Sequence, residues 1–164
     1  MRYAKIKKIE IENGKGVGTS LFVQGCPIHC KGCHNLETWD FEGGEPWTQE
    51  VEDEWFEHIG HTYIDRVSIL GGEPLARDNF GTVLHILHRL RTDYPGKKVW
   101  VYTGYPLEKV DEIIMCYTDY IVAGPYIESK RNISLPFRGS ENQIIWNCKE
   151  GKEWNSSQTL YSFR

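Results

Sequence analysis

The sequence predicts an α/β fold, and we expect a partial, open (β/α) barrel with a mostly parallel sheet. Short apolar segments alternate with amphipathic segments of about 10–15 residues, which is typical of βαβ units. A closed eight-stranded barrel needs about 200 residues or more, whereas this chain has 164. Hydrophobic residues make up 40% of the chain and charged residues 26%, as in a globular protein, so we expect one domain over residues 1–164.

Residues 1–60 contain two predicted strands and one predicted helix. Apolar and charged residues alternate over residues 4–11, as in a half-buried strand. The glycines of residues 14–18 precede a strand, whereas a dinucleotide loop opens a helix, so they indicate a turn. Residues 20–24 (SLFVQ) form the second strand. Thr48 is a suitable N-cap for a helix over residues 49–59, where apolar residues recur every four positions.

The second half repeats the alternation of strand and helix. Asp78 can cap a helix whose apolar stripe reaches Leu90, and Pro106 can open another helix in its first turn. Predicted strands precede and follow these helices, at residues 66–70, 98–102, 120–122 and 143–146. In parallel sheets of this kind, ligands bind at the carboxyl ends of the strands.

Three cysteines follow the second predicted strand directly. Cys26, Cys30 and Cys33 lie in the segment GCPIHCKGC (residues 25–33) with the spacing C-x3-C-x2-C. A structural zinc site needs a fourth ligand. A four-iron cluster is normally held by four thiolates, so three thiolates leave one iron with an open position, which is typical of a catalytic metal. The spacing therefore favours a [4Fe-4S] cluster.

The cysteine segment also has two simpler interpretations. In the first, His29 or His34 completes a zinc knuckle, and in the second the three residues are unrelated buried thiols. The other two cysteines, Cys116 and Cys148, stand alone in the sequence, and we expect them to be small buried apolar residues.

Charge and hydropathy argue against two classes of partner. Lys and Arg total 19 against 23 Asp and Glu, and no basic tract is present, so we expect no binding to nucleic acid. The longest unbroken apolar run, residues 113–117, is too short to span a membrane. Residues 1–12 alternate charged and apolar residues and do not form a secretory signal, so we expect a cytoplasmic protein without membrane contact.

The tetrapeptide Gly-Gly-Glu-Pro occurs twice, in different contexts. Residues 71–74 follow a predicted strand, where glycines let a ligand approach the backbone and a glutamate can accept hydrogen bonds from an ammonium group. Residues 43–46 have no strand before them and precede a helix cap, so we interpret them as an ordinary turn. The second copy is the candidate site.

Together, these segments resemble the radical S-adenosylmethionine superfamily, in which C-x3-C-x2-C binds the cluster and a GGE-type strand end holds the methionyl amino group. Within it, the sequence is most similar to the glycyl-radical activases that activate anaerobic ribonucleoside-triphosphate reductase. Four segments carry the resemblance: SLFVQGCPIHCKGCHN (20–35) with the following Thr38-Trp39, ILGGEPL (69–75), VYTGY (101–105) and RGSENQ (138–143).

The resemblance implies that Cys26, Cys30 and Cys33 hold three irons of a [4Fe-4S] cluster and that S-adenosylmethionine chelates the fourth. Reductive cleavage then gives a 5′-deoxyadenosyl radical, which takes a hydrogen atom from a glycine of the large subunit of anaerobic ribonucleoside-triphosphate reductase. A flavodoxin-like protein is the implied electron donor, and no catalytic residue is expected beyond the cluster and cofactor. The residues implied to bind S-adenosylmethionine are Gly32, His34, Gly71, Gly72, Glu73, Pro74 and Thr103.

The sequence departs from the family's usual pattern at Lys15, Gly18 and Ala123. Gly32 departs from the superfamily's usual aromatic residue, although the family of activating proteins tolerates glycine there. Two other functions stay open: a radical S-adenosylmethionine enzyme that acts on a small heterocycle, and a non-catalytic metal-binding module. The short chain and residues 138–143 favour the activase over the first. The missing fourth cysteine and residues 71–74 favour it over the second.

Overall fold

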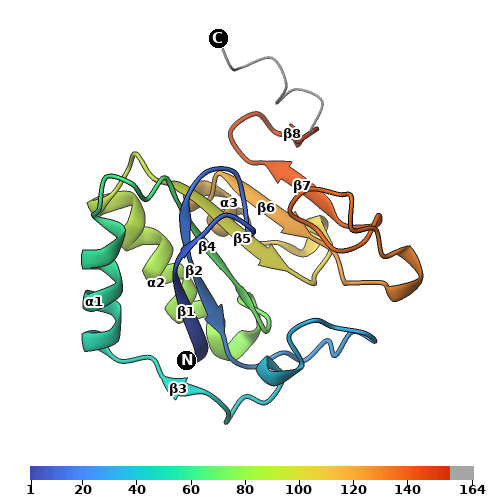
Figure 1. Cartoon of the computed structure of the whole chain (residues 1–164), viewed down its shortest axis with the longest axis horizontal. Coiled ribbons are helices and arrows are strands. Elements are labelled where there is room, and N and C mark those ends of the chain that lie inside the picture. Colours follow the sequence, from blue (N-terminus) through green and yellow to red (C-terminus); the bar gives the residue numbers. More distant parts are fainter. Residues whose placement is uncertain (156–164) are drawn as a thin grey trace.

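In the computed structural model, which describes residues 1–155, the strands form one open sheet in the order β3-β1-β2-β4-β5-β6-β7-β8 (Figure 1). The strands are β1 (Arg2–Glu10), β2 (Gly18–Val23), β3 (Glu45–Pro46), β4 (Arg66–Gly71), β5 (Lys98–Thr103), β6 (Tyr120–Ala123), β7 (Ile144–Asn147) and β8 (Lys152–Glu153). The α-helices are α1 (Gln49–Ile59), α2 (Arg77–Asp93) and α3 (Glu112–Tyr117). Short 3-10 helices are η1 (Leu36–Thr38), η2 (Leu107–Lys109) and η3 (Glu128–Lys130).

The sheet is mixed, which corrects the expectation of a mostly parallel one. Parallel pairing joins β2 to β4, β4 to β5 and β5 to β6. The four other pairings, which involve the outer strands, are antiparallel. Residues 11–17 connect β1 to β2, and this is too short for a crossover between parallel strands, which takes about a dozen residues or more.

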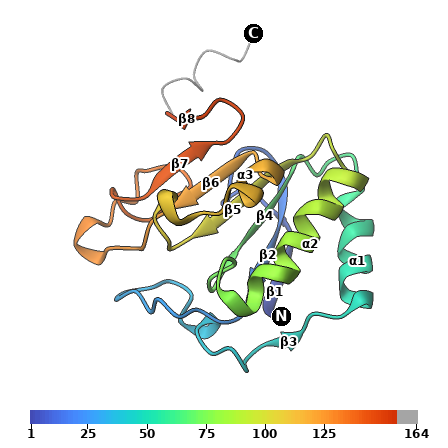
Figure 2. The same cartoon turned by 180° about the vertical axis from the view of Figure 1, so that it is seen from behind.

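Helices α1, α2 and α3 cover one face of the sheet (Figure 2). Alternate residues of the strands point to this face, and Val67 and Ile69 of β4 are fully buried there. They meet the apolar stripe of α2, which contributes the buried Val83 and Leu87. None of the helices in residues 1–155 combines the length and apolar character needed to cross a membrane.

The opposite face of the sheet, which we call the cavity face, carries a buried ion pair. Nη1 of Arg66 lies 2.6 Å from Oε1 of Glu10 and donates to Oγ of Ser68 at 2.7 Å. The hairpin between β1 and β2 folds over this pair. Gly14 has a φ of 134°, and a Cβ there would collide with the side chains of Arg66 and Trp100. The predicted glycine turn is confirmed, and the close approach explains why glycine is needed.

The other predicted elements are largely confirmed, with three differences. Helix α1 has the predicted bounds, and Oγ1 of Thr48 caps it by accepting from Val51 N. Helix α2 begins at Arg77, so Asp78 lies in its first turn and is not its cap. The helix expected after Pro106 is split into η2 and α3, because the chain is extended at residues 110–111. The two-residue strands β3 and β8 were not predicted.

Candidate functional site

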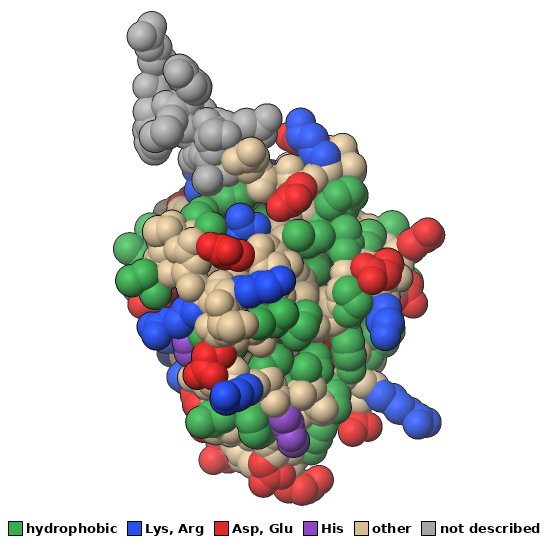
Figure 3. All heavy atoms as spheres, turned by 90° about the vertical axis from the view of Figure 1, so that its right-hand side faces the viewer, with side chains coloured by type: hydrophobic (Ala, Val, Ile, Leu, Met, Phe, Trp, Pro, Cys, Tyr) green, Lys and Arg blue, Asp and Glu red, His purple; other side chains and the backbone are tan. Residues whose placement is uncertain are grey.

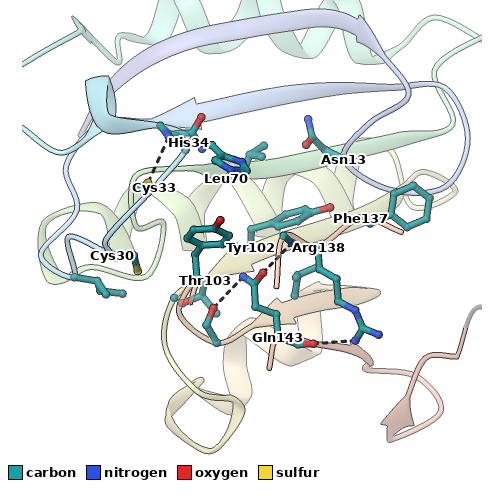
Figure 4. Close-up of a pocket in the computed structure, with 18 of the residues that line it drawn as sticks. Asn13, Cys30, Cys33, His34, Leu70, Tyr102, Thr103, Phe137, Arg138 and Gln143 are labelled. Carbon is teal, nitrogen blue, oxygen red and sulfur yellow. Dashed lines mark hydrogen bonds between the residues drawn. The ribbon is translucent and has the colours of Figure 1, made fainter. Parts of the chain in front are cut away.

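The loops after β2, β4 and β5 meet at the carboxyl ends of these parallel strands. They border one cavity of about 480 Å³ (Figure 4), a volume typical of small-molecule sites. The predicted site residues that line it are Cys26, Cys30, Cys33, His34, Gly71, Gly72, Glu73 and Thr103. The structure thus brings together three segments that lie far apart in the sequence, as the strand-end argument predicts.

The cysteine segment is an irregular loop, as its glycines and proline predict. The backbone N–H of Cys26 donates to the carbonyl of Trp39, and that of Cys33 to the carbonyl of Cys30, both at 3.1 Å. The ring of His29 stacks on the indole of Trp39 with the ring centres 4.3 Å apart. These contacts fix the loop against the segment that follows it, with all three cysteines bordering the cavity.

The three thiols are free, and all three border the cavity. Burial raises the pKa of Cys26 and Cys30, although backbone N–H groups oppose the shift, so metal binding must displace protons. Within residues 1–155, no three His, Cys, Asp or Glu side chains converge closely enough to hold a single metal ion. A four-iron cluster does not require such convergence, because each thiolate binds a different iron.

The two remaining cysteines lie outside this cavity. Cys116 is exposed on α3, which corrects the expectation that it is buried, because the apolar contacts of this short helix are made by Ile114. Cys148 is half-buried after β7, and burial raises the pKa of its thiol to about 12. Neither residue borders the cavity that contains the other three.

Close contact with β2 shapes the Gly-Gly-Glu segment after β4. The N–H of Gly72 donates to the carbonyl of Val23 at 2.9 Å, and the N–H of Glu73 to the carbonyl of Gly25 at 2.8 Å. Gly71 has a φ of 109°, and a Cβ on Gly71 or Gly72 would collide with the backbone of β2 or of Gly25. The glycines therefore let two backbones touch, a reason that the sequence did not reveal.

Glu73 is buried at the centre of the site, and no cation of residues 1–155 pairs with it. Its Oε1 accepts from Oγ1 of Thr103 at 2.8 Å and from the N–H of Leu75 at 2.9 Å. Its Oε2 accepts from the N–H of Gly104 at 2.7 Å. Burial raises the pKa of this carboxyl to about 7, even though the three donors favour the ionised form. A carboxylate has about four lone-pair positions, so Oε2 can accept one further donor from a ligand.

Asn79 is a positioning residue that the sequence analysis missed. Its side chain is 1% exposed, and Nδ2 donates to the carbonyls of Gln24 and Glu73, both at 3.0 Å. One amide group thus links the start of the cysteine loop to the Gly-Gly-Glu segment. The available signal was a polar residue in the apolar stripe of α2, four positions before Val83.

Two predicted cofactor residues, Gly32 and Pro74, do not border the cavity. A Cβ on Gly32 would come within 2.9 Å of the Glu128 carboxylate, so this glycine instead lets the cysteine loop approach η3. Pro74 is buried. His34 is exposed at the cavity, and its ring centre lies 5.1 Å from that of Tyr126.

The segment 138–143 closes on itself beside the cavity. Nη1 of Arg138 donates to the carbonyl of Gln143 at 2.8 Å, and the Gln143 side chain accepts from the N–H of Gly139 at 2.9 Å. Nε2 of Gln143 in turn donates to the carbonyl of Gly124 at 3.1 Å. The polar residues of this segment thus hold the loop between β6 and β7 in shape.

The first Gly-Gly-Glu-Pro copy has a different environment. Glu45 and Pro46 form the edge strand β3, paired with β1, which corrects the expectation of a turn alone. The Glu45 side chain is exposed. The same four residues therefore make an open sheet edge in one place and a buried site in the other.

Comparisons with known proteins agree with this geometry. Residues 12–146 match the family described as a 4Fe-4S single cluster domain. The anaerobic ribonucleoside-triphosphate reductase-activating proteins of Vibrio cholerae and of Escherichia coli K12 are each 37% identical over 150 residues, covering 88% of this chain and 97% of theirs. The protein of the same name from Enterobacteria phage T4 is 32% identical over 152 residues, covering 92% of this chain and 97% of its own. Identity at this level over nearly the whole length shows that the chain belongs to the family of anaerobic ribonucleoside-triphosphate reductase-activating proteins.

Proposed function

We propose that this protein is a radical S-adenosylmethionine activase that generates a glycyl radical on an anaerobic ribonucleoside-triphosphate reductase. The observation that carries the proposal is the cavity where Cys26, Cys30 and Cys33 meet the buried Glu73. Family membership supports the same function, because the relatives are named for activating anaerobic ribonucleoside-triphosphate reductase. In this proposal the chain acts as one cytoplasmic domain over residues 1–164, with its open sheet serving as a partial barrel.

The three cysteines are proposed to hold a [4Fe-4S] cluster on the side of the cysteine loop that borders the cavity. When bound, the cluster and S-adenosylmethionine supply one-electron cleavage of the sulfur–C5′ bond, which gives methionine and a 5′-deoxyadenosyl radical. The chain binds and orients these groups and excludes water from them. Its irregular loop keeps the three thiolates apart, so that each can bind a different iron.

Glu73 is proposed to position the amino group of S-adenosylmethionine. Its Oε2 has one protein donor, Gly104 N, and can accept a second donor from the ligand. Thr103 acts on the other oxygen and fixes the carboxyl group in place. Gly71, Gly72 and His34 complete the proposed contacts, whereas Gly32 and Pro74 act by shaping the two loops.

The partner is proposed to be the large subunit of the reductase, whose glycine must reach the cavity. An open sheet suits this role, because a closed barrel would exclude a polypeptide. Docking also replaces a chance encounter by a fixed geometry, so that the radical is used before it is quenched. The electron donor is proposed to be a flavodoxin-like protein.

Electron paramagnetic resonance tests the proposal. The sample contains cluster-loaded protein, a reductant, S-adenosylmethionine and the reductase, with its glycines either normal or deuterated at the α-carbon. We expect a glycyl doublet whose splitting collapses on deuteration, and deuterium in the released 5′-deoxyadenosine. Cofactor cleavage without a glycyl signal, coupled to turnover of a small heterocycle, would contradict the proposal.

A further inference from the structure

Tyr102 borders the cavity, and its hydroxyl group has no hydrogen-bond partner in the described part of the chain. Its ring lies between the side that carries Cys30 and Cys33 and the side that carries Phe137 and Arg138 (Figure 4). The hydroxyl oxygen is buried and makes no hydrogen bond within residues 1–155. Burial raises the pKa of this phenol, so it stays protonated at neutral pH. A buried polar group without a hydrogen-bond partner destabilises the folded protein, which indicates that a ligand supplies the missing acceptor.

The hydroxyl lies toward the end of the strands opposite to the proposed cofactor anchor. Figure 4 shows the Tyr102 hydroxyl pointing away from Cys30 and Cys33, toward the side of Phe137, and the charge of Arg66 acts on the phenol. The Arg66 guanidinium lies beside Ser68, three residues before the last residue of β4, so roughly 10 Å separates it from that end of the strand at about 3.3 Å per residue. Glu73 follows Gly71, beside the cysteine loop. The Tyr102 hydroxyl is therefore directed away from the group that anchors the amino-acid part of the cofactor.

The wall beside Tyr102 comes from the loop between β6 and β7, and it opens to solvent. Ile133 borders the cavity and is 87% exposed, while Leu135 and Phe137 are half-buried. Nε of Arg138 is a second buried donor without a partner in the described residues. Figure 3 views the molecule from this side and shows hydrophobic side chains gathered down the middle of the face, with charged side chains on either side. A ligand that enters here needs apolar groups and hydrogen-bond acceptors.

We propose that this end of the cavity, bordered by Tyr102, Ile133 and Arg138, binds an extended segment of the partner polypeptide, and that the Tyr102 hydroxyl donates to one of its backbone carbonyls. The inference rests on the proposed function and deepens it, because it identifies residues that hold the segment next to the radical-accepting glycine. A polypeptide provides both carbonyl acceptors and apolar side chains. The sulfonium cation suits this end poorly, because the guanidinium groups of Arg131 and Arg138 also border it.

The test compares Tyr102→Phe with the unchanged protein, both loaded with the cluster. Anaerobic calorimetry measures the dissociation constant for the whole reductase and, separately, that for S-adenosylmethionine. Loss of one hydrogen bond should weaken reductase binding about two- to tenfold. The affinity for S-adenosylmethionine should stay within about twofold of that of the unchanged protein. Tyr63→Phe is the matched control: Tyr63 is 48% exposed and does not border the cavity, so the change should move neither constant.

A second pair of variants tests the apolar contact. Ile133→Asp should weaken reductase binding more than tenfold, because it places a charge in the interface. Ile113→Asp, on the exposed side of α3, should leave reductase binding intact. Thermal unfolding establishes that each variant is folded.

Two results would overturn the inference. If Tyr102→Phe weakens only S-adenosylmethionine binding, the hydroxyl serves the cofactor. If it changes neither constant, water satisfies the hydroxyl and the segment binds elsewhere. Neither result affects the proposed function, which depends on the glycyl signal of the unchanged protein.

Discussion

The two ends of the parallel strands hold buried carboxylates in opposite electrostatic situations. At the amino end, burial alone would raise the pKa of Glu10, but hydrogen bonds from Arg66, Ser20 and Asn13 N hold it at about 2. At the carboxyl end, burial raises the pKa of Glu73 to about 7, and no cation of residues 1–155 opposes it. Glu10 already has its counter-charge within the fold, whereas Glu73 is the residue that we propose to receive a donor from a ligand. The amino end thus stabilises the chain, and the carboxyl end is the proposed binding end.

The largest expected difference between the two ends is in iron content. Replacing Cys26, Cys30 or Cys33 by Ala should abolish the cluster, because three thiolates are the minimum that holds it here. Iron analysis and the visible absorbance after anaerobic reconstitution measure this. Cys116→Ala and Cys148→Ala are the controls, since both residues lie away from the cavity. Loss of iron in either control would show that the cluster has a fourth protein ligand.

The amino end should instead respond in stability. Arg66→Met leaves Glu10 buried without its cation, and removing one partner of a buried pair costs about 3–5 kcal/mol of unfolding free energy. Urea unfolding of the cluster-loaded protein measures the change, and iron content should stay the same. Lys8→Met is the matched control, because its pair with Glu54 is exposed and should contribute less than about 1 kcal/mol. Equal losses in the two variants would refute the structural role of the Glu10–Arg66 pair.

The two carboxylates should also give opposite pH dependences. Glu10 has a lowered pKa, so its stabilising contribution is present above pH 4.5 and is lost as the pH falls toward 2. Glu73 has a raised pKa, so the folded state keeps a proton that the unfolded state has released. Its contribution is therefore present below pH 4.5 and is lost as the pH rises through 7.

The Glu73→Gln variant isolates this second effect, because its amide does not titrate. The unfolding free energy of the unchanged protein, relative to this variant, should fall by roughly 3 kcal/mol between pH 4.5 and 7.5, as a pKa of about 7 in place of 4.5 requires. Urea unfolding of both proteins at several pH values, without S-adenosylmethionine, measures how the difference in unfolding free energy changes with pH. A difference that stays constant over this range would mean that Glu73 ionises normally in the folded protein.

The sequence predicted the carboxyl end of the parallel strands better than the amino end. Cysteine spacing and a Gly-Gly-Glu segment after a strand are local signals, and the strand-end rule places them together without any knowledge of side-chain packing. The helix at residues 49–59 was likewise predictable, because its cap and apolar period agree. These features depend on residues close together in the sequence.

Features that depend on distant contacts were not predictable. Arg66 begins a strand and has no local signal that it pairs with Glu10, 56 positions earlier. Whether an outer strand is antiparallel depends on the edge of the sheet to which its connecting loop leads, and the sequence does not show this. The two-residue strands β3 and β8 are too short to show an alternation of apolar and polar residues. Tyr102 in VYTGY gave no sign of a buried hydroxyl, because that depends on the loop that covers it.

The smallest expected effect compares the two Gly-Gly-Glu-Pro copies as ligand sites. Glu73→Gln should weaken S-adenosylmethionine binding by about tenfold to a hundredfold, because a charge-assisted hydrogen bond is worth about 1.5–3 kcal/mol. Glu45→Gln should leave the affinity unchanged, since Glu45 is exposed on the edge strand β3. Anaerobic calorimetry on the cluster-loaded variants measures both constants at a pH above 7, where Glu73 is mostly ionised. Equal losses would show that the carboxylate acts through overall charge. A loss in Glu45→Gln alone would move the cofactor to the sheet edge, against the burial and the hydrogen bonds that distinguish the second copy.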